Sequence, residues 1–215
     1  AEVLEAQTFP PEPLAEEDFS FDFDAEGQGW LLSPGVDLGA GATQPAWLQQ
    51  PGEPLPAWLE ALPELSAEAV EQLRLRQGFP AAPGELNDST NPFELGLAPW
   101  VSLNKGCYVG QETLAKLATY DGVKQQLRRW FWRGTQDPGE PGTVLTGDEP
   151  SSPRAGLITS SLALEDGLWI GLALVRRQSL QQTCLRAGPD PDGALLELSR
   201  LPAWVDPPVG AGRKS

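Results

Sequence analysis

The alternation of apolar and polar positions is clearest in the C-terminal half of the chain. Short apolar runs there are separated by Gly, Pro and Asp, which is typical of short strands joined by tight turns. Five segments carry this pattern: residues 127–133, 155–161, 168–175, 183–187 and 195–201. Strands at this spacing favour a small antiparallel barrel or sandwich. We therefore predict an antiparallel β-barrel domain over residues 126–206, followed by a loose tail at 207–215.

One helix is well supported before this region. Ser66 is suited to cap its N-terminus, and Gly78 is suited to end it in a left-handed conformation. Acidic residues lie in its first half and two arginines near its end, as the helix dipole favours. The apolar spacing predicts that Val70 and Leu73, with Gln77, form the inner face. A second helix is expected from about residue 111 to 120, closed by Asp-Gly.

The N-terminal third carries weaker signals. Three phenylalanines at period two suit one face of a strand: Phe19, Phe21 and Phe23. The apolar residues 30–32 predict a short strand that runs into a turn at 33–36. Residues 40–57 are rich in Gly, Pro and Gln and favour a loop. We assign residues 1–125 to one region, and the whole chain to the α+β class.

The charge of the chain is concentrated at its N-terminal end. The net charge is −15, and residues 1–73 hold 15 acidic side chains without a single Lys or Arg. This excess argues against direct nucleic-acid binding, which needs cations to replace counterions, and favours a solubilising or poorly ordered acidic segment. No apolar run approaches the length of a membrane helix. Because the sequence begins with Ala1 and contains no Met, we expect an N-terminally truncated chain.

The cysteine and histidine content excludes several kinds of site. Cys107 and Cys184 are the two cysteines, and there is no His. Without a secretory signal, two such cysteines are expected to be free thiols. This composition argues against a structural zinc site and is too poor in Cys for an iron–sulfur cluster held by this chain alone, and the lack of His excludes a His-dependent catalytic triad.

One block of residues has the chemistry of a reactive site. It reads Lys105-Gly106-Cys107-Tyr108-Val109-Gly110-Gln111-Glu112. The cysteine lies between two glycines and just before the predicted helix, where helix N–H groups and a nearby lysine favour a thiolate. The alternative is a small buried cysteine in a tight turn. The glutamate in the first helical turn is either a surface residue that matches the helix dipole or a ligand-binding group.

This block resembles the K-G-C-[aromatic]-x-G-Q-E signature of YgfZ-type folate-binding proteins, which are relatives of the glycine-cleavage T-protein. All eight positions fit without a gap. Residues 91–97 with Trp100 resemble the P-x-E-x-G-L-x-W stretch of the same superfamily, and Glu94 is its acidic position. Residues 73–78, Arg128, 156–160 and 171–177 extend the resemblance, which is closest to the cyanobacterial and plastid branch.

The resemblance implies a ring of domains around a folate pocket, with the signature loop beside it. The implied cofactor is tetrahydrofolate or a one-carbon derivative. The implied site residues are Cys107 as the functional thiol, with Lys105, Tyr108, Gln111, Glu112 and Glu94 around the ligand. A tyrosine ring can flank the flat pterin, and the amide and carboxylate can satisfy its polar edge. We expect these signature residues to cluster at one cavity, and Cys184 to fill space in the barrel.

Two departures from the family pattern stand out. Only 104 residues precede the signature, so the aspartate that acts in true aminomethyltransferases has no counterpart that can be assigned. Arg76 stands where many T-protein relatives have a glutamate that faces the pterin.

The resemblance implies a tetrahydrofolate-binding accessory protein that supports iron–sulfur cluster assembly or repair in client enzymes. Its expected partners are folate and those enzymes or assembly factors, with no membrane. The expected location is the cytoplasm, or the plastid stroma in a plant. The alternatives are a folate-dependent aminomethyltransferase, which would make the protein an enzyme, and a non-catalytic interaction module with an incomplete pocket.

Overall fold

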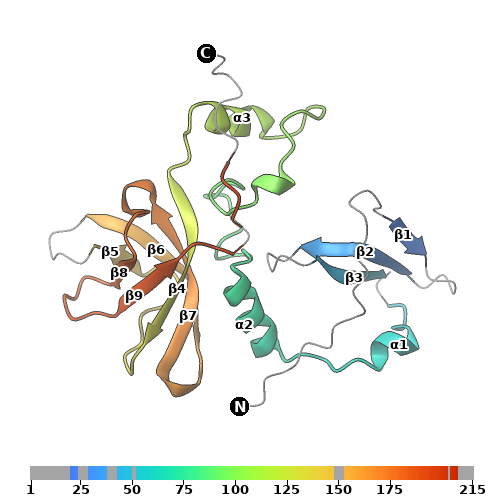
Figure 1. Ribbon diagram of the computed structural model, residues 1–215, viewed down its shortest axis with the longest axis horizontal. Coiled ribbons are helices and arrows are strands. Elements are labelled where there is room, and N and C mark those ends of the chain that lie inside the picture. The colour runs from blue at the N-terminus through green and yellow to red at the C-terminus, as the bar shows by residue number, and fades with distance from the viewer. Residues whose placement is uncertain are drawn as a thin grey trace. The chain divides into compact units, whose positions relative to one another are not determined.

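The computed structural model describes residues 20–23, 29–37, 43–49, 52–147, 153–202 and 204–207 (Figure 1). The chain divides into two compact units. The first comprises residues 1–37 and 42–63, and the second comprises 38–41 and 64–215. Each unit is described by itself.

The first unit contains a three-stranded antiparallel sheet in the order β1-β2-β3. Its elements are β1 (Ser20–Phe23), β2 (Gly29–Asp37), β3 (Thr43–Gln49) and the short helix α1 (Ala57–Glu60). The turn predicted at residues 33–36 is wrong, because β2 continues through it with a register shift between Leu32 and Val36. The loop predicted over 40–57 is also wrong, because β3 lies within it. Phe19 lies outside the described residues.

The second unit begins with α2 (Ala67–Gln77), whose predicted ends are confirmed. Ser66 accepts a hydrogen bond from the Ala69 amide at 3.1 Å, and Gly78 closes the helix with φ of 77°. The predicted inner face is wrong: the side chains of Val70 and Leu73 are exposed, whereas Leu75 is buried. The predicted face is wrong because the contact of α2 with the barrel includes a partly buried arginine as well as apolar residues.

That arginine, Arg74, uses all of its N–H groups within the unit. Its Nε and Nη2 donate to Glu71 at 2.7 and 2.6 Å, and Nη2 also donates to Ser160 Oγ at 2.9 Å. Its Nη1 donates to the Phe79 carbonyl at 2.8 Å and to Glu85 Oε2 at 3.2 Å. Glu85 is fully buried. Burial lowers the pKa of Arg74, but the two carboxylates outweigh it and the net shift is upward. This network ties α2 to the barrel.

Helix α3 (Gln111–Thr119) and the loops before it form a small layer of their own. Phe93, Ala118 and Val123 make its buried centre. The 3-10 turn η1 (Ala98–Trp100) lies in these loops, and the described part of the barrel adds η2 (Glu165–Gly167) and η3 (Arg177–Ser179). Among the described residues, no helix is long and apolar enough to cross a membrane.

The C-terminal half forms a closed antiparallel barrel in the order β4-β7-β6-β5-β8-β9, as predicted from the sequence. Its strands are β4 (Gln125–Arg133), β5 (Val144–Thr146), β6 (Arg154–Ala163), β7 (Leu168–Arg176), β8 (Cys184–Ala187) and β9 (Leu195–Ser199). The short strand β5 was not predicted. Pairing of Arg129 with Ser199 between β4 and β9 closes the barrel.

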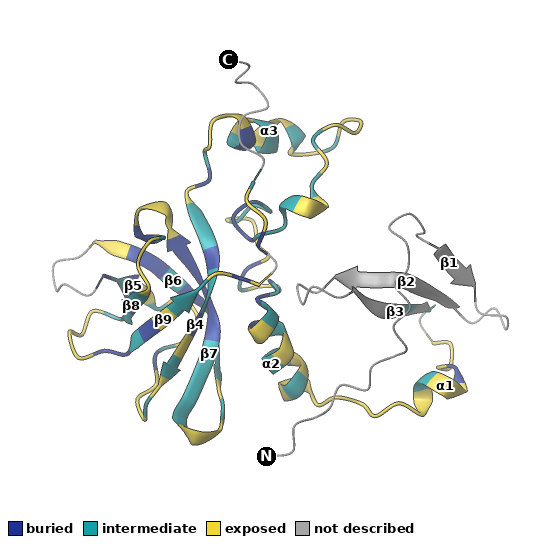
Figure 2. Cartoon of the chain, in the orientation of Figure 1, coloured by how far each residue is buried: buried dark blue, intermediate teal, exposed yellow. Residues whose placement is uncertain are grey.

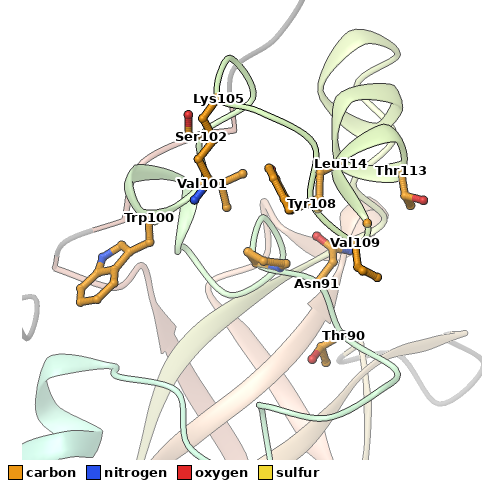
Figure 3. Close-up of a pocket in the computed structure, with 12 residues that line it drawn as sticks. Thr90, Asn91, Trp100, Val101, Ser102, Lys105, Tyr108, Val109, Thr113 and Leu114 are labelled. Carbon is orange, nitrogen blue, oxygen red and sulfur yellow. The ribbon is translucent and has the colours of Figure 1, made fainter.

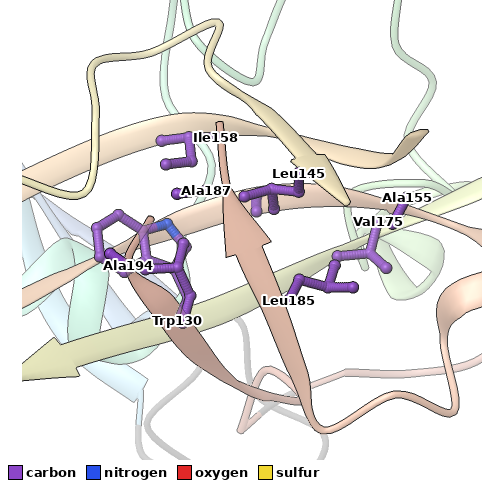
Figure 4. Close-up of a cluster of buried hydrophobic side chains, with 10 residues drawn as sticks. Trp130, Leu145, Ala155, Ile158, Val175, Leu185, Ala187 and Ala194 are labelled. Atoms are coloured by element: carbon purple, nitrogen blue, oxygen red, sulfur yellow. The ribbon is translucent and has the colours of Figure 1, made fainter. Parts of the chain in front are cut away.

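Buried residues are concentrated in the barrel strands (Figure 2), and they form two apolar clusters. One cluster gathers Trp130, Leu145 and Ile158 with other fully buried side chains (Figure 4). A second cluster packs Leu75 of α2 against residues that include Leu172. Alternate residues of β7 belong to the two clusters, which explains why this strand is an almost continuous apolar run in the sequence.

Candidate functional site

The signature loop lies between η1 and α3, and its backbone depends on one glycine. Gly110 precedes α3 with φ of 88°, a left-handed conformation that glycine adopts without steric cost. A Cβ placed at Gly110 or at Gly106 would meet no other atom within 4 Å. Backbone conformation, and not crowding, is therefore the reason for glycine at position 110, and the loop surface around both glycines is open.

Gln111 holds this loop against the start of α3. Its Nε2 donates to the carbonyl oxygens of Leu103 at 3.1 Å and Lys105 at 3.0 Å. Its backbone N–H donates to the Tyr108 carbonyl at 3.2 Å. The side-chain amide donors are therefore engaged with the protein backbone, and Gln111 positions the loop.

A pocket of about 600 Å³ opens beside the loop (Figure 3). Its wall combines aromatic and aliphatic side chains with hydroxyl groups, an amide and one ammonium group. The lining residues are Thr90, Asn91, Pro92, Trp100, Val101, Ser102, Lys105, Tyr108, Val109, Gly110, Thr113 and Leu114. A pocket of this size and composition is typical of small-molecule sites.

Tyr108 lies at the centre of this wall, between the loop that carries Val101 and the Leu114 side chain of α3 (Figure 3). Lys105 Nζ lies 5.5 Å from the centroid of the tyrosine ring, within the range of a cation–π contact. The Tyr108 hydroxyl is buried and has no hydrogen-bond partner among the described residues. An unpartnered buried hydroxyl costs free energy.

Two other signature residues lie outside the pocket wall. Cys107 is exposed, as a free thiol on the surface of the loop. Glu112 is also exposed and forms an ion pair with Lys116 one turn along α3, at 2.7 Å. Of the five signature residues expected around one cavity, the structure thus brings Lys105 and Tyr108 into its wall. Gln111, Cys107 and Glu112 are not lining residues.

Glu94 is buried next to the pocket without lining it. Its Oε2 accepts hydrogen bonds from Gln125 Nε2 and from the backbone N–H of Asn91, both at 3.3 Å. Burial raises the pKa of this carboxyl, and the two hydrogen bonds oppose that shift. Since Asn91 does line the pocket, Glu94 supports the pocket wall from behind.

The sequence did not single out the hydroxyl groups of the wall. Thr90, Ser102 and Thr113 carry no motif signal, because isolated hydroxyl residues are common in turns. Trp100 belongs to the P-x-E-x-G-L-x-W stretch, but the resemblance assigned no role to it. Its ring is 60% exposed, so it forms an open edge of the pocket and not a buried wall.

The chain is homologous to YgfZ-like and glycine-cleavage T-protein-like proteins. A chloroplast protein of Arabidopsis thaliana, provisionally named a transferase, is 36% identical over 160 residues, which are 72% of this chain and 36% of that protein. The tRNA-modifying protein YgfZ of Hamiltonella defensa is 27% identical over 135 residues, covering 61% of this chain and 40% of its own length. No family model matches the sequence.

A solved structure supports the same fold. The glycine cleavage system aminomethyltransferase T from Bartonella henselae aligns with a TM-score of 0.51 and 20% identity, over 63% of this chain and 38% of that one. The chain therefore spans between about a third and two fifths of the length of these relatives.

Proposed function

We propose that this chain is part of a tetrahydrofolate-binding accessory protein that supports iron–sulfur cluster assembly or repair in client enzymes. The observation that carries the folate assignment is the pocket of about 600 Å³, whose wall combines Tyr108 with the Lys105 ammonium group. The kinship with YgfZ-like and T-protein-like proteins supplies the choice of ligand.

The lining residues fit the parts of a folate. The Tyr108 ring offers a flat apolar surface for a pterin. The Lys105 ammonium can pair with a carboxylate of the glutamyl group. The hydroxyls of Thr90 and Ser102 can both donate and accept, as the mixed polar edge of a pterin requires. A bound tetrahydrofolate would supply the one-carbon chemistry, and these side chains would bind and orient it.

The accessory role rests on Cys107. Its thiol is exposed on a loop whose position is fixed by the hydrogen bonds of Gln111. A thiol on the open surface of a well-positioned loop can reach a partner protein, whereas Cys184 is a partly buried residue of β8. We therefore propose Cys107 as the functional thiol.

A folate-dependent transferase is the second candidate. The provisional transferase name of the Arabidopsis relative and the T-protein fold favour it. Turnover distinguishes the two functions, because a transferase moves a one-carbon group between two substrates without any client enzyme. The chloroplast location in the name of the same relative supports a plastid-stromal location if the chain comes from a plant, and a cytoplasmic one otherwise.

Calorimetry with tetrahydrofolate and its 5-formyl derivative tests the folate assignment. Lys105→Gln and Tyr108→Leu should each weaken binding roughly tenfold, because the first removes a charged contact and the second removes the flat ring. Lys116→Gln is the matched control, since it removes the same charge from an exposed residue of α3 that does not line the pocket. Equal losses in Lys105→Gln and Lys116→Gln would contradict the site.

The accessory role is tested in cells that lack the endogenous protein. Cys107→Ser should fail to restore the activity of iron–sulfur enzymes, whereas Cys184→Ser should restore it. Alkylation of the purified protein near neutral pH should modify Cys107 first, because this thiol is exposed. An inactive, folded Cys184→Ser together with an active Cys107→Ser would reverse the assignment.

A further inference from the structure

Two arginines face one tryptophan ring beside the seam where β4 and β9 close the barrel. Arg128 is in β4, and Arg200 directly follows β9, just beyond the pairing of Arg129 with Ser199. The Cζ atom of Arg128 lies 5.5 Å from the Trp204 ring centroid, and that of Arg200 lies 5.9 Å from it. Figure 1 shows β9 beside β4 where the two strands pair.

The carboxylate beside these two arginines already has partners. Asp206 Oδ2 forms an ion pair with Arg200 at 2.8 Å, and its Oδ1 accepts a hydrogen bond from Trp204 Nε1 at 2.9 Å. Each carboxylate oxygen thus has a partner. In the part of the chain that the structure describes, two guanidinium groups share this one neighbouring carboxylate.

Of the two arginines, Arg128 has the weaker hydrogen bonding around its guanidinium group. Its one hydrogen bond to a described residue is a long contact of 3.4 Å from Nη1 to the Leu127 carbonyl. Arg74, by contrast, reaches two carboxylates, a hydroxyl and a carbonyl from a similarly half-buried position. Burial and the charge of Arg200 both lower the pKa of Arg128, and Asp206 opposes this shift. A half-buried cation beside a like charge is destabilised unless an anion joins it.

We propose that Arg128 and Arg200 form a binding site for an oxyanion, either a carboxylate or a phosphate group, with the Trp204 ring as its apolar wall. A guanidinium presents two N–H groups in a planar fork that matches the oxygens of both anions. A bound oxyanion would balance the excess positive charge and satisfy the free donors of Arg128. This site does not use any residue of the signature pocket and is independent of the folate proposal.

Titration of the whole chain at constant ionic strength tests the proposal, with inorganic phosphate and glutarate as probes in separate arms. Binding is followed by the NMR signal of the Trp204 indole N–H, which is assigned with Trp204→Phe. A saturable shift is expected with at least one probe, and the arm that binds more tightly identifies the anion class. Arg128→Gln should weaken binding at least about tenfold, because it removes charge-assisted hydrogen bonds.

The matched control is Arg176→Gln, which removes an exposed arginine at the end of β7 and should change the affinity by less than about twofold. Arg128→Lys and Arg200→Gln provide further variants if Arg128→Gln does not fold, and both should weaken binding. The absence of a saturable shift with either probe would show that the two arginines only hold the C-terminal segment. Equal losses in the Arg128 and Arg176 variants would also overturn the proposal.

Discussion

Replacing Glu85 by Gln should lower the free energy of unfolding, because this carboxylate has three donors and no contact with water. It accepts from Arg74 at 3.2 Å, from the Ala81 backbone N–H at 3.0 Å and from Ser160 Oγ at 2.7 Å. Glutamine keeps the shape of the side chain but turns one of its two acceptors into a donor. At least one of the three donors would then face an N–H group.

The size of the loss follows from the burial of the two carboxylates that contact Arg74. The Glu85 side chain is 1% exposed, whereas that of Glu71 is 38% exposed. Removing one partner of a buried ion pair costs about 3–5 kcal/mol. Because Glu71 remains beside Arg74, we expect the lower end, about 3 kcal/mol. Glu71→Gln removes a partner from a largely solvated pair and should cost about 0.5 kcal/mol.

Urea unfolding at pH 7, followed by far-ultraviolet circular dichroism, measures both losses against the unmodified chain. Glu71→Gln is the matched control, since it makes the same chemical change at the other carboxylate of the same arginine. If the two variants were equally stable, or if Glu85→Gln lay within about 1 kcal/mol of the unmodified chain, the buried network would not have the role assigned to it.

Three further changes test other parts of the structure. Burial raises the pKa of Glu94, so the folded chain holds its proton more tightly and stability falls as pH rises from the unfolded to the folded pKa. Glu94→Gln should remove that loss in urea midpoints measured between about pH 4 and about pH 7, and an unchanged profile would exclude this role. Gly171→Ala would place a Cβ 2.0 Å from the Ser160 carbonyl oxygen and 2.4 Å from Trp130. We expect this overpacking to cost roughly 3 kcal/mol of stability and to lower the thermal midpoint. A midpoint equal to that of the unmodified chain would refute the close packing. Tyr108→Phe removes an unpartnered buried hydroxyl and should raise the free energy of unfolding by about 1 kcal/mol without ligand, whereas a loss in urea unfolding would show that the hydroxyl is satisfied.

The barrel could be predicted because its longer strands carry their own signal. In β4, β6 and β7, apolar residues recur over nine or ten positions and turn residues bound them. Strand β5 has three residues, which are too few to show a period, and its place in the sheet depends on pairing with β6 and β8. Its existence is therefore a property of the closed barrel and not of its own sequence.

The side of α2 that contacts the barrel shows a different limit of prediction from sequence. The apolar spacing of Val70 and Leu73 is real, but the helix buries Leu75 and partly buries Arg74 instead. An arginine can be buried only where acceptors converge on it, and here one of them, Ser160, is 86 positions away. Sequence periodicity treats such a residue as solvent-facing and therefore rotates the predicted contact face.

In the candidate site, too, some features could be predicted from the sequence and others could not. The motif brought Lys105 and Tyr108 to attention, and both line the pocket. The solvent-facing pair of Glu112 with Lys116 has the i, i+4 spacing typical of a helix surface, so that signal was present in the sequence. The bonds of Gln111 to loop carbonyls had no such signal, because they depend on how the chain turns before α3.

Those bonds of Gln111 have a kinetic consequence. A nine-residue helix is only marginally stable alone, and its first turn frays most readily. The Gln111 side-chain amide, which donates to the carbonyl oxygens of Leu103 and Lys105, lies in that first turn. Each fraying event therefore releases the loop as well. The backbone amides of the loop and those at the start of α3 should then exchange hydrogen at one common rate. The signature loop should therefore stay in place only for as long as the first turn of α3 stays folded.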